Sequence, residues 1–321
     1  MPSLISFLHT LVVYTVVGTA VSFALSLAAC AFFKIGKPAV KTKLFFLTLI
    51  VPLLAYLFHY FISPVLKLQH GATFFEPSNR VFAYLCSLGV LGSMYYLPLL
   101  LLIAFGLYRM GIYYWHCRKI AFQTLDLSAQ AYRLPGKILS ELANAAGVET
   151  PILKILKGTG YSCFTYGVFK PAIAISANLL DILSEEELQA VLSHELGHIA
   201  HRDSLLNWIA VALRDMSVYL PFTHLALRML HAEQEFAADE FAINITRKPL
   251  IYSAALIKAW RKSKESSKAQ IHPVPAFAAE ARISDRVERV IRGETGGKQG
   301  DCYWLLLTIG IVTIAVLAYV C

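Results

Sequence analysis

The sequence predicts a multi-pass α-helical membrane protein with four transmembrane helices and one domain of mixed α+β structure. Of its 321 residues, 57% are hydrophobic and only 16% are charged, and the mean hydropathy is +0.56. A composition this apolar is typical of membrane proteins rather than of soluble enzymes. The apolar residues form four long runs, and the segment between the third and fourth runs has the mixed composition of a folded domain.

The first apolar run, Leu4 to Phe33, contains His9 but no charged residue. It is long enough to span a bilayer with some tilt. A cleaved signal peptide is the alternative, because Leu27-Ala28-Ala29-Cys30 resembles a lipoprotein cleavage site. However, no Lys or Arg precedes the run, whereas signal peptides have a basic start. We therefore expect a first transmembrane helix.

The second and third runs, Leu44 to Ser63 and about Val81 to Tyr108, predict two more transmembrane helices. Cations flank them on one side: Lys34, Lys37, Lys41 and Lys43 before the second run, and Arg109, Arg118 and Lys119 after the third. Segments rich in Lys and Arg stay in the cytoplasm under the positive-inside rule. The chain should therefore enter the cytoplasm after the third span.

Residues 121–299 have the pattern of a cytoplasmic α+β domain. Ile138 to Ala146 predicts a short helix, while Pro151 to Leu156 and Pro171 to Ser176 predict strands. The fourth apolar run, Tyr303 to Val320, then predicts a last span. We divide the chain into a three-helix transmembrane region (residues 1–120), this domain (121–299) and a C-terminal transmembrane helix (300–321).

The segment His194-Glu195-Leu196-Gly197-His198 carries the clearest chemical signal. On a helix, residues four apart lie on one face, so both imidazoles can bind one ion while Glu195 points beside it. Ser184 followed by Glu187 predicts a capping box that starts such a helix. A charged surface helix is the alternative, but the neighbours are apolar: Leu188, Val191, Leu192, Leu196 and Ile199. The pattern favours a zinc hydrolase.

A catalytic zinc needs three protein ligands and an open position for water. The residue ten positions after the first histidine is Ser204, so a third histidine is not available there. Glu235 and Asp239 lie four apart, so on a helix Glu235 can bind the metal while Asp239 accepts a hydrogen bond from a liganding histidine. The alternative is an exposed acidic helix. We expect one zinc ion per chain.

These residues resemble the integral-membrane gluzincin peptidases. The resemblance rests on the run Leu183 to Asp203 and on Glu235-Phe236-Ala237-Ala238-Asp239, and it covers about residues 130–290. The group includes HtpX heat-shock proteases, CAAX prenyl endopeptidases and the protease halves of β-lactam sensor-transducers. Ser162 to Ser176 is similar to the strand segment before the zinc helix in the sensor-transducer branch. The resemblance implies a zincin-like (gluzincin) catalytic domain with metal ligands His194, His198 and Glu235, general base Glu195, and Asp239 supporting a ligand.

The apolar stretch Leu205 to Phe222 could form a further span, but the site argues against this. One crossing between His198 and Glu235 would place ligands of one zinc on opposite sides of a bilayer about 30 Å thick. Two crossings of about 20 residues each do not fit into the 36 residues between them. We expect a helix that lies in the core or against the bilayer surface.

Further features of the sequence concern partners and the site. A group of basic residues follows the third ligand and consists of Lys258, Arg261, Lys262, Lys264 and Lys268. This group favours contact with anionic lipid headgroups over contact with nucleic acid, because the sequence contains no nucleic-acid-binding motif. The group that stabilises the oxyanion stays open, with His231, His272 and Arg286 as candidates. A strand beside the zinc helix could pair with an extended substrate or could be an ordinary internal strand. The oligomeric state is not predicted, and the spacing of the six cysteines predicts no disulfide framework.

The sequence therefore predicts a zinc-dependent endopeptidase in the inner or plasma membrane. Its catalytic domain would lie in the cytoplasm and cleave membrane or membrane-associated polypeptides, with Glu195 activating a zinc-bound water. One alternative is a regulatory, signal-transducing protease of the sensor-transducer type that acts on a repressor, although the chain ends at Cys321 without the extracellular ligand-binding domain of those sensors. A proteolytically inactive membrane scaffold is another, but it would need none of the site residues.

Overall fold

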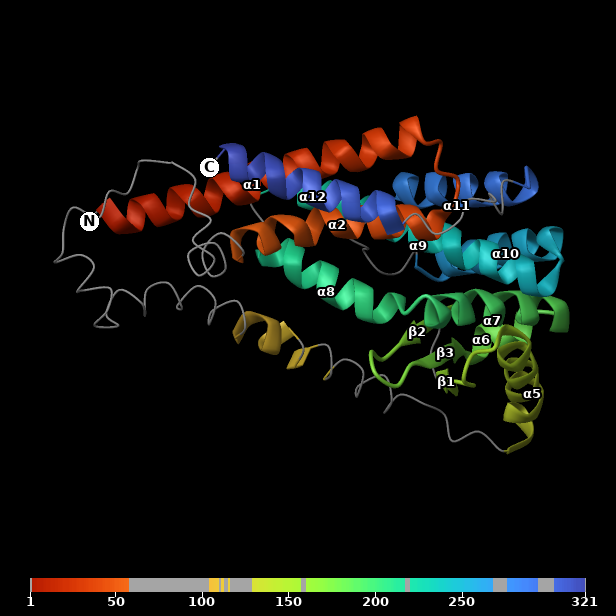
Figure 1. Cartoon of the computed structure of the whole chain (residues 1–321). Coiled ribbons are helices and arrows are strands. Elements are labelled where there is room, and N and C mark those ends of the chain that lie inside the picture. Colours follow the sequence, from red (N-terminus) through yellow and green to blue (C-terminus); the bar gives the residue numbers. More distant parts are fainter. Residues whose placement is uncertain are drawn as a thin grey trace.

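The computed structural model describes residues 2–57, 104–109, 111–112, 115, 129–156, 160–216, 220–267, 276–293 and 303–320. Most of the third apolar run and His272 lie outside these ranges. The described chain is mostly helical, with one small mixed sheet (Figure 1). Its helices are α1 (Pro2–Phe32), α2 (Pro38–Leu57), α5 (Ala129–Ala146), α6 (Ala177–Ile182), α7 (Glu185–Ala200), α8 (Asp203–Met216), α9 (Pro221–Thr246), α10 (Pro249–Ser267), α11 (Ala276–Ile291) and α12 (Tyr303–Val320).

The sheet has three strands in the order β1-β3-β2: β1 (Ile152–Leu156), β2 (Cys163–Tyr166) and β3 (Ala172–Ser176). The central strand β3 is buried along its whole length. It runs parallel to β1 and antiparallel to β2, with Thr165 opposite Ile173. The two strands predicted from hydrophobic pattern are confirmed as β1 and β3. The four-residue β2 is half-buried throughout, so it lacks the apolar pattern that identified the other two.

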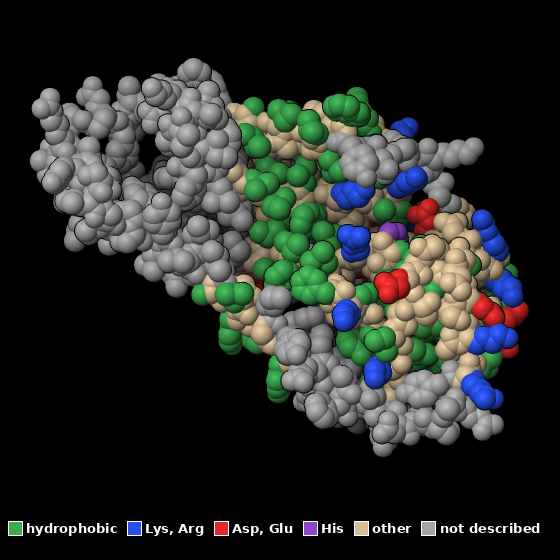
Figure 2. Space-filling view, turned by 60° about the horizontal axis from the view of Figure 1, so that its bottom comes forward, with side chains coloured by type: hydrophobic (Ala, Val, Ile, Leu, Met, Phe, Trp, Pro, Cys, Tyr) green, Lys and Arg blue, Asp and Glu red, His purple; other side chains and the backbone are tan. Residues whose placement is uncertain are grey.

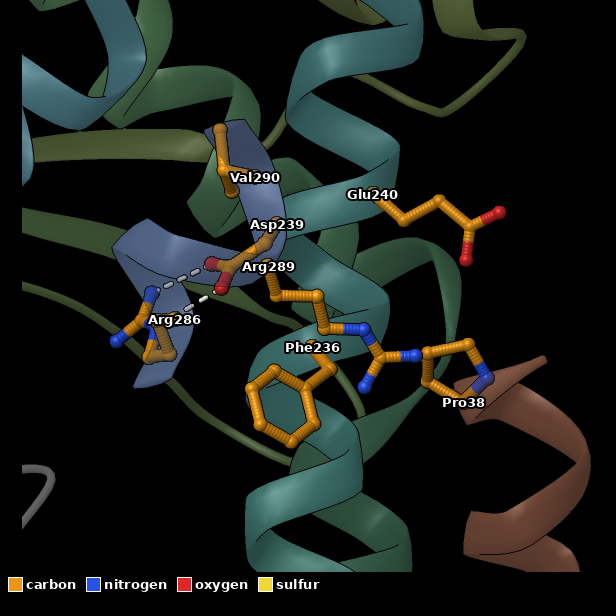
Figure 3. Close-up of a pocket in the computed structure, with 7 residues that line it drawn as sticks. All are labelled: Pro38, Phe236, Asp239, Glu240, Arg286, Arg289 and Val290. Carbon is orange, nitrogen blue, oxygen red and sulfur yellow. Dashed lines mark hydrogen bonds and ion pairs between the residues drawn. The ribbon is translucent and has the colours of Figure 1, made fainter. Parts of the chain in front are cut away.

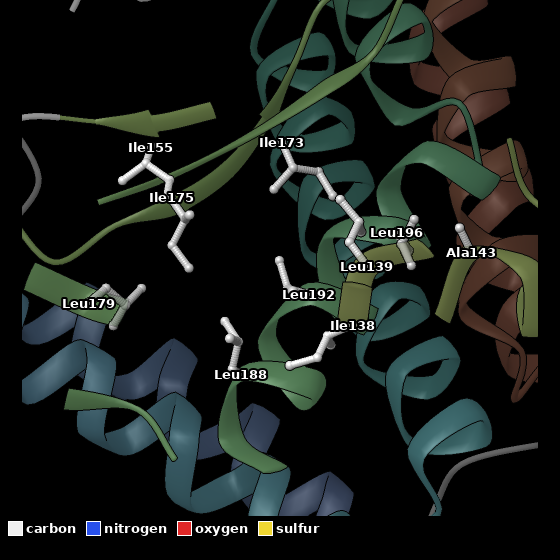
Figure 4. Close-up of a cluster of buried hydrophobic side chains, with 10 residues drawn as sticks. All are labelled: Ile138, Leu139, Ala143, Ile155, Ile173, Ile175, Leu179, Leu188, Leu192 and Leu196. Atoms are coloured by element: carbon white, nitrogen blue, oxygen red, sulfur yellow. The ribbon is translucent and has the colours of Figure 1, made fainter. Parts of the chain in front are cut away.

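The core of this domain lies between the sheet, α5 and α7 (Figure 4). The sheet contributes Ile155, Ile173 and Ile175, and α7 contributes Leu188, Leu192 and Leu196. Of the apolar residues that argued against a charged surface helix, these three leucines face this core and Ile199 packs against it. Helix α5 is longer than the predicted segment 138–146, because it begins at Ala129 and continues through Pro135. The predicted start of this helix was wrong, since Pro135 and Gly136 do not interrupt it.

Helices α8 and α9 form a hairpin beside α1 and α2 (Figure 1). Leu213 of α8 and Leu227 of α9 share one buried cluster with Phe23 of α1 and with Phe45 and Leu49 of α2. The stretch predicted as one helix from Leu205 to Phe222 is therefore divided between most of α8 and the start of α9. The hairpin returns the chain toward the N-terminal end of α8. Helix α9 therefore packs on α7, as it must if Glu235 is to reach the histidines of α7. In the part of the chain that is described, no helix is both long and apolar enough to cross a membrane.

Helix α10 closes the domain against α7. Lys258 donates a hydrogen bond of 2.6 Å to the Glu187 carboxylate near the start of α7. Lys262 pairs with Glu265 on its own helix. These two members of the predicted basic group are therefore engaged with acidic side chains, and Lys268 lies outside the described residues.

Candidate metal centre

Helix α7 carries the two histidines, and its start is fixed by the predicted capping box. The Ser184 side chain accepts a hydrogen bond from the Glu187 backbone N–H, and the Glu187 carboxylate accepts one from the Ser184 N–H. These bonds satisfy two backbone donors that a helix start leaves without partners. The helix then continues to Ala200. His194 and His198 thus lie one turn apart on the same face.

Close packing of α7 on α9 brings Glu235 to these histidines. Gly197 permits the approach, because a Cβ atom added there would lie 3.0 Å from the Ala238 Cα and 3.2 Å from the Phe241 Cβ. Ala238 is itself buried and small. The glycine between the two histidines is therefore a packing residue that sets the separation of the two helices.

The side chains of His194, His198 and Glu235 form one cluster whose ligand atoms lie within 4.8 Å of one another. The two Nε2 atoms are 3.2 Å apart. The Glu235 carboxylate oxygens lie 3.6 Å from the His194 Nε2 and 3.7 Å from the His198 Nε2. Atoms bound to one tetrahedral zinc at about 2.0–2.1 Å are about 3.3 Å apart. This two-histidine, one-carboxylate set therefore fits a zinc ion with little rearrangement.

His194 is held from behind by two groups. Its Nδ1 lies 3.1 Å from the Asp239 Oδ1 and 3.1 Å from the Tyr252 hydroxyl. Tyr252 also donates a hydrogen bond to Asp239. A proton on Nδ1, donated to Asp239, leaves Nε2 as the lone-pair nitrogen that faces the cluster. The predicted pairing of Asp239 with a histidine of the site is thus present, while no role was predicted for Tyr252.

A second carboxylate holds His198 in the same way. The His198 Nδ1 lies 2.7 Å from the Asp203 Oδ2. The Gln234 side chain donates a hydrogen bond of 3.2 Å to the other oxygen of Asp203. Asp203 reaches back to His198 because the chain turns between α7 and α8, where Arg202 has a φ of 57°. Helical spacing does not extend across this turn, so the contact between Asp203 and His198 was not predicted from spacing.

Arg286 of α11 binds two carboxylates of α9, those of Glu235 and Asp239. It makes two hydrogen bonds to Asp239, of 2.9 Å from Nε and 2.6 Å from Nη2 (Figure 3), and its Nη1 lies 2.8 Å from the Glu235 Oε2. All three of its nitrogens are therefore used to hold carboxylates. Of the other two oxyanion candidates, His231 is exposed on α9 and His272 lies outside the described residues.

The electrostatics of the cluster favour a bound cation. Burial raises the pKa of Asp239, but the Arg286 charge and the His194 hydrogen bond lower it further, to about 2. Burial likewise opposes ionisation of Glu235, yet contacts with His194 and Arg286 hold its pKa well below the usual range. Burial lowers the pKa of His194, while contacts with Asp239 and Glu235 raise it more, to about 9. The carboxylates of Glu235 and Asp239 are therefore ionised at neutral pH. A metal ion bound to the His194 Nε2 would replace the proton on that nitrogen.

Glu195 lies on the same helix and is 6% exposed. Thr165 of the edge strand β2 donates a hydrogen bond of 2.8 Å to its Oε2 atom. The predicted base is therefore a buried carboxylate that faces the sheet edge beside the ligand cluster. Thr165 was not predicted as a site residue, because the contact depends on how β2 packs on α7.

Comparison with known proteins identifies related chains. The family model described as BlaR1 peptidase M56 matches residues 72–290. Protease HtpX of Legionella pneumophila (strain Corby) is 26% identical over 176 residues, which cover 43% of this chain and 63% of that protein. A Protease HtpX homolog of Ralstonia pickettii (strain 12J) is 26% identical over 229 residues, 59% of this chain and 78% of that protein. The chain thus spans 63% of the length of the Legionella relative.

Proposed function

Because the chain belongs to the BlaR1 peptidase M56 family of zinc metallopeptidases, we propose that it is an endopeptidase with its active site at the cluster of His194, His198 and Glu235. The observation that carries the proposal is the convergence of these three ligand atoms from α7 and α9 at the separations that a zinc ion requires. A scaffold without activity would need neither this geometry nor the residues that support the ligands, Asp203, Asp239 and Arg286.

The chemistry follows from the arrangement of the chain's own groups. Zinc held by the three ligands would supply Lewis acidity to the attacking water and to the scissile carbonyl. Glu195 accepts the proton of the water and then delivers it to the leaving amine. Asp239 and Asp203 hold the two imidazoles in orientation, since each bonds the Nδ1 atom that faces away from the cluster. Arg286 fixes the carboxylates of Glu235 and Asp239.

The substrate proposed for this site is a polypeptide in extended conformation. In the described sheet the strand order is β1-β3-β2, so β2 is an edge strand, and an added strand would lie beside it. Pairing of this kind binds main chain and tolerates varied side chains. Thr165 faces Glu195 on one side of β2. The rings of Phe164 and Tyr166 lie near each other on the opposite side, where alternate substrate side chains would contact them.

The enzyme is proposed to act at the cytoplasmic boundary of a membrane, beside the apolar runs of the sequence. Exposed hydrophobic side chains gather in one band, and Lys and Arg side chains line its border with the catalytic part (Figure 2). The connection between α1 and α2 and the first turn of α2 both contact the helices of the site region. Lys41 lies 3.3 Å from Glu233 of α9, and Arg289 of α11 donates to the Gly36 carbonyl at 3.2 Å. A site at this level suits membrane or membrane-associated substrates.

A regulatory protease that acts on a repressor is the second candidate. The family match to BlaR1 peptidase favours it, while the relatives called Protease HtpX favour a general protease. Both candidates use the same site and chemistry. They differ in substrate range, which cleavage of a panel of unrelated polypeptides would reveal.

The proposal is tested by zinc content and peptide cleavage in the purified, detergent-solubilised chain, with Glu195→Gln as the key variant. We expect about one zinc per chain in both proteins, and loss of cleavage by at least about 100-fold in the variant, because the general base is absent. Glu185→Gln, an exposed change at the start of the same helix, is the matched control and should cleave normally. Absence of zinc from the wild-type protein would contradict the site.

A further inference from the structure

Glu195 differs from Glu235 and Asp239 in how its charge is held. Glu235 and Asp239 both contact Arg286. Glu195 is 6% exposed, and no cation of the described chain forms an ion pair with it. A carboxylate removed from water needs a hydrogen-bond donor, because burial without one is costly. Some other group must therefore hold this side chain.

We propose that Thr165 is the positioning residue for Glu195, orienting its carboxylate for proton transfer. The Thr165 Oγ1 lies 2.8 Å from the Glu195 Oε2 and 3.1 Å from the backbone carbonyl of the same residue. Among the described side chains, this hydroxyl is the donor that reaches the Glu195 carboxylate. The inference rests on the proposed function, since it concerns the base of that reaction.

The position of Thr165 makes its hydroxyl a fixed reference point. Thr165 pairs with Ile173 of the central strand, and Ile173 is completely buried in the core. A glutamate side chain on a helix has three rotatable bonds, so the helix alone does not fix its carboxylate. The Thr165 hydroxyl therefore links the Glu195 carboxylate to the sheet, while the backbone of Glu195 belongs to α7.

This link also relates the base to the substrate. The strand that carries Thr165 is the edge strand that is proposed to bind extended polypeptides. The four residues of β2 would thus set both the position of the scissile bond and the orientation of the Glu195 carboxylate. Misplacement of about 1 Å between reacting groups can cost about 100-fold in rate.

The test compares Thr165→Val with Thr165→Ser in the full-length, zinc-loaded protein. Valine keeps the shape and the β-branch of threonine but removes the donor, whereas serine keeps the donor. We expect valine to lower kcat by about 10- to 100-fold with KM changed less than about twofold. Serine should restore most of kcat, and zinc content should be the same in all three proteins. A wild-type kcat in the valine variant, or no recovery with serine, would overturn the inference.

A second readout does not depend on activity. In the zinc-free protein, Thr165→Val should lower the melting temperature by about 2–4 °C. The same change should have little effect in a Glu195→Ala background, where the hydrogen bond is already absent. Equal effects in both backgrounds would disprove the contact. If the wild-type protein neither binds zinc nor cleaves, the proposed function fails, while this double-mutant cycle still decides whether Thr165 holds Glu195.

Discussion

The imidazoles of the site are each oriented by one carboxylate, and the two carboxylates come from different places in the chain. Asp239 lies on α9, one turn after Glu235, and holds His194. Asp203 begins α8 and holds His198. Both are 3% exposed, so hydrogen bonds within the protein replace most of their contact with bulk water. Orientation of the ligands is therefore built from both neighbouring helices.

Replacement of Asp203 by Asn is expected to weaken zinc binding without unfolding the protein. An amide can present its NH2 group to the His198 Nδ1, which favours the wrong tautomer. We expect the zinc dissociation constant to rise by about 10- to 100-fold, measured by competition with a chromophoric chelator. Asp181→Asn, at an exposed position on α6, is the matched control. Unchanged affinity in D203N would mean that the contact does not support the metal.

Residues that share one helix were the ones accessible to prediction. His194, Glu195 and His198 are related by helical periodicity, and so are Glu235 and Asp239, so their grouping follows from spacing and from what zinc requires. Thr165, Asp203 and Tyr252 reach the site from other elements, and their contacts depend on packing that spacing does not encode. For Arg286 the residue was identified as a candidate, but its contacts with the Glu235 and Asp239 carboxylates were not predicted.

At the scale of elements, the separation of α7 and α9 decides whether the three ligand atoms can meet. The contact between these helices is lined by small buried residues, among them Ala190 and Ala242. Gly197 is the tightest point, as a Cβ there would approach the backbone of Ala238. Small residues allow close backbone approach, and the ligand side chains then reach across a short gap.

Gly197→Ala is therefore expected to push α9 away from the histidines and to lower zinc affinity by about tenfold or more. The gain that alanine normally gives inside a helix should not compensate, because the added methyl group meets backbone. Gly136→Ala on α5 is the control, since nothing lies within 4 Å of the added Cβ. That variant should bind zinc normally and melt at the same or a higher temperature. Normal zinc binding by G197A would show that α7 and α9 can accommodate the added methyl group without moving Glu235 away from the histidines.

The elements themselves were predicted unevenly. The capping box, the zinc helix and strands β1 and β3 follow from local signals that the fold leaves intact. The start of α5 and the strand β2 do not. Pro135 is tolerated inside α5 because tertiary packing of Ile138 and Leu139 stabilises the helix beyond its local preference. The edge strand β2 is specified by its pairing with β3 rather than by its own four residues.

At the scale of the whole molecule, the catalytic part is held together by contacts between elements far apart in sequence. The family comparisons agree with the gluzincin resemblance found in the zinc-helix region and extend it over residues 72–290. Helix α10 makes one of these contacts between elements far apart in sequence. Its Lys258 donates hydrogen bonds to the Glu187 carboxylate at the start of α7 and to the Ile182 carbonyl. The neighbouring pair of Lys248 and Glu186 joins the same two parts but is more exposed on both sides.

This difference predicts a pH-dependent contribution to stability. Burial raises the pKa of Glu187, but the Lys258 hydrogen bond and those of Ser184 lower it more, so the folded pKa lies below the unfolded value of about 4.3. The contribution of Glu187 is therefore fully present above that value and is lost as the pH falls through the folded pKa. Lys258→Met should lower the melting temperature at pH 7 by about 2 °C, and the difference from wild type should narrow below about pH 4. Lys248→Met should melt within about 1 °C of wild type at every pH, since exposed ion pairs contribute little. A pH-independent difference for K258M would assign its effect to lost packing or to the Ile182 carbonyl rather than to the Glu187 charge.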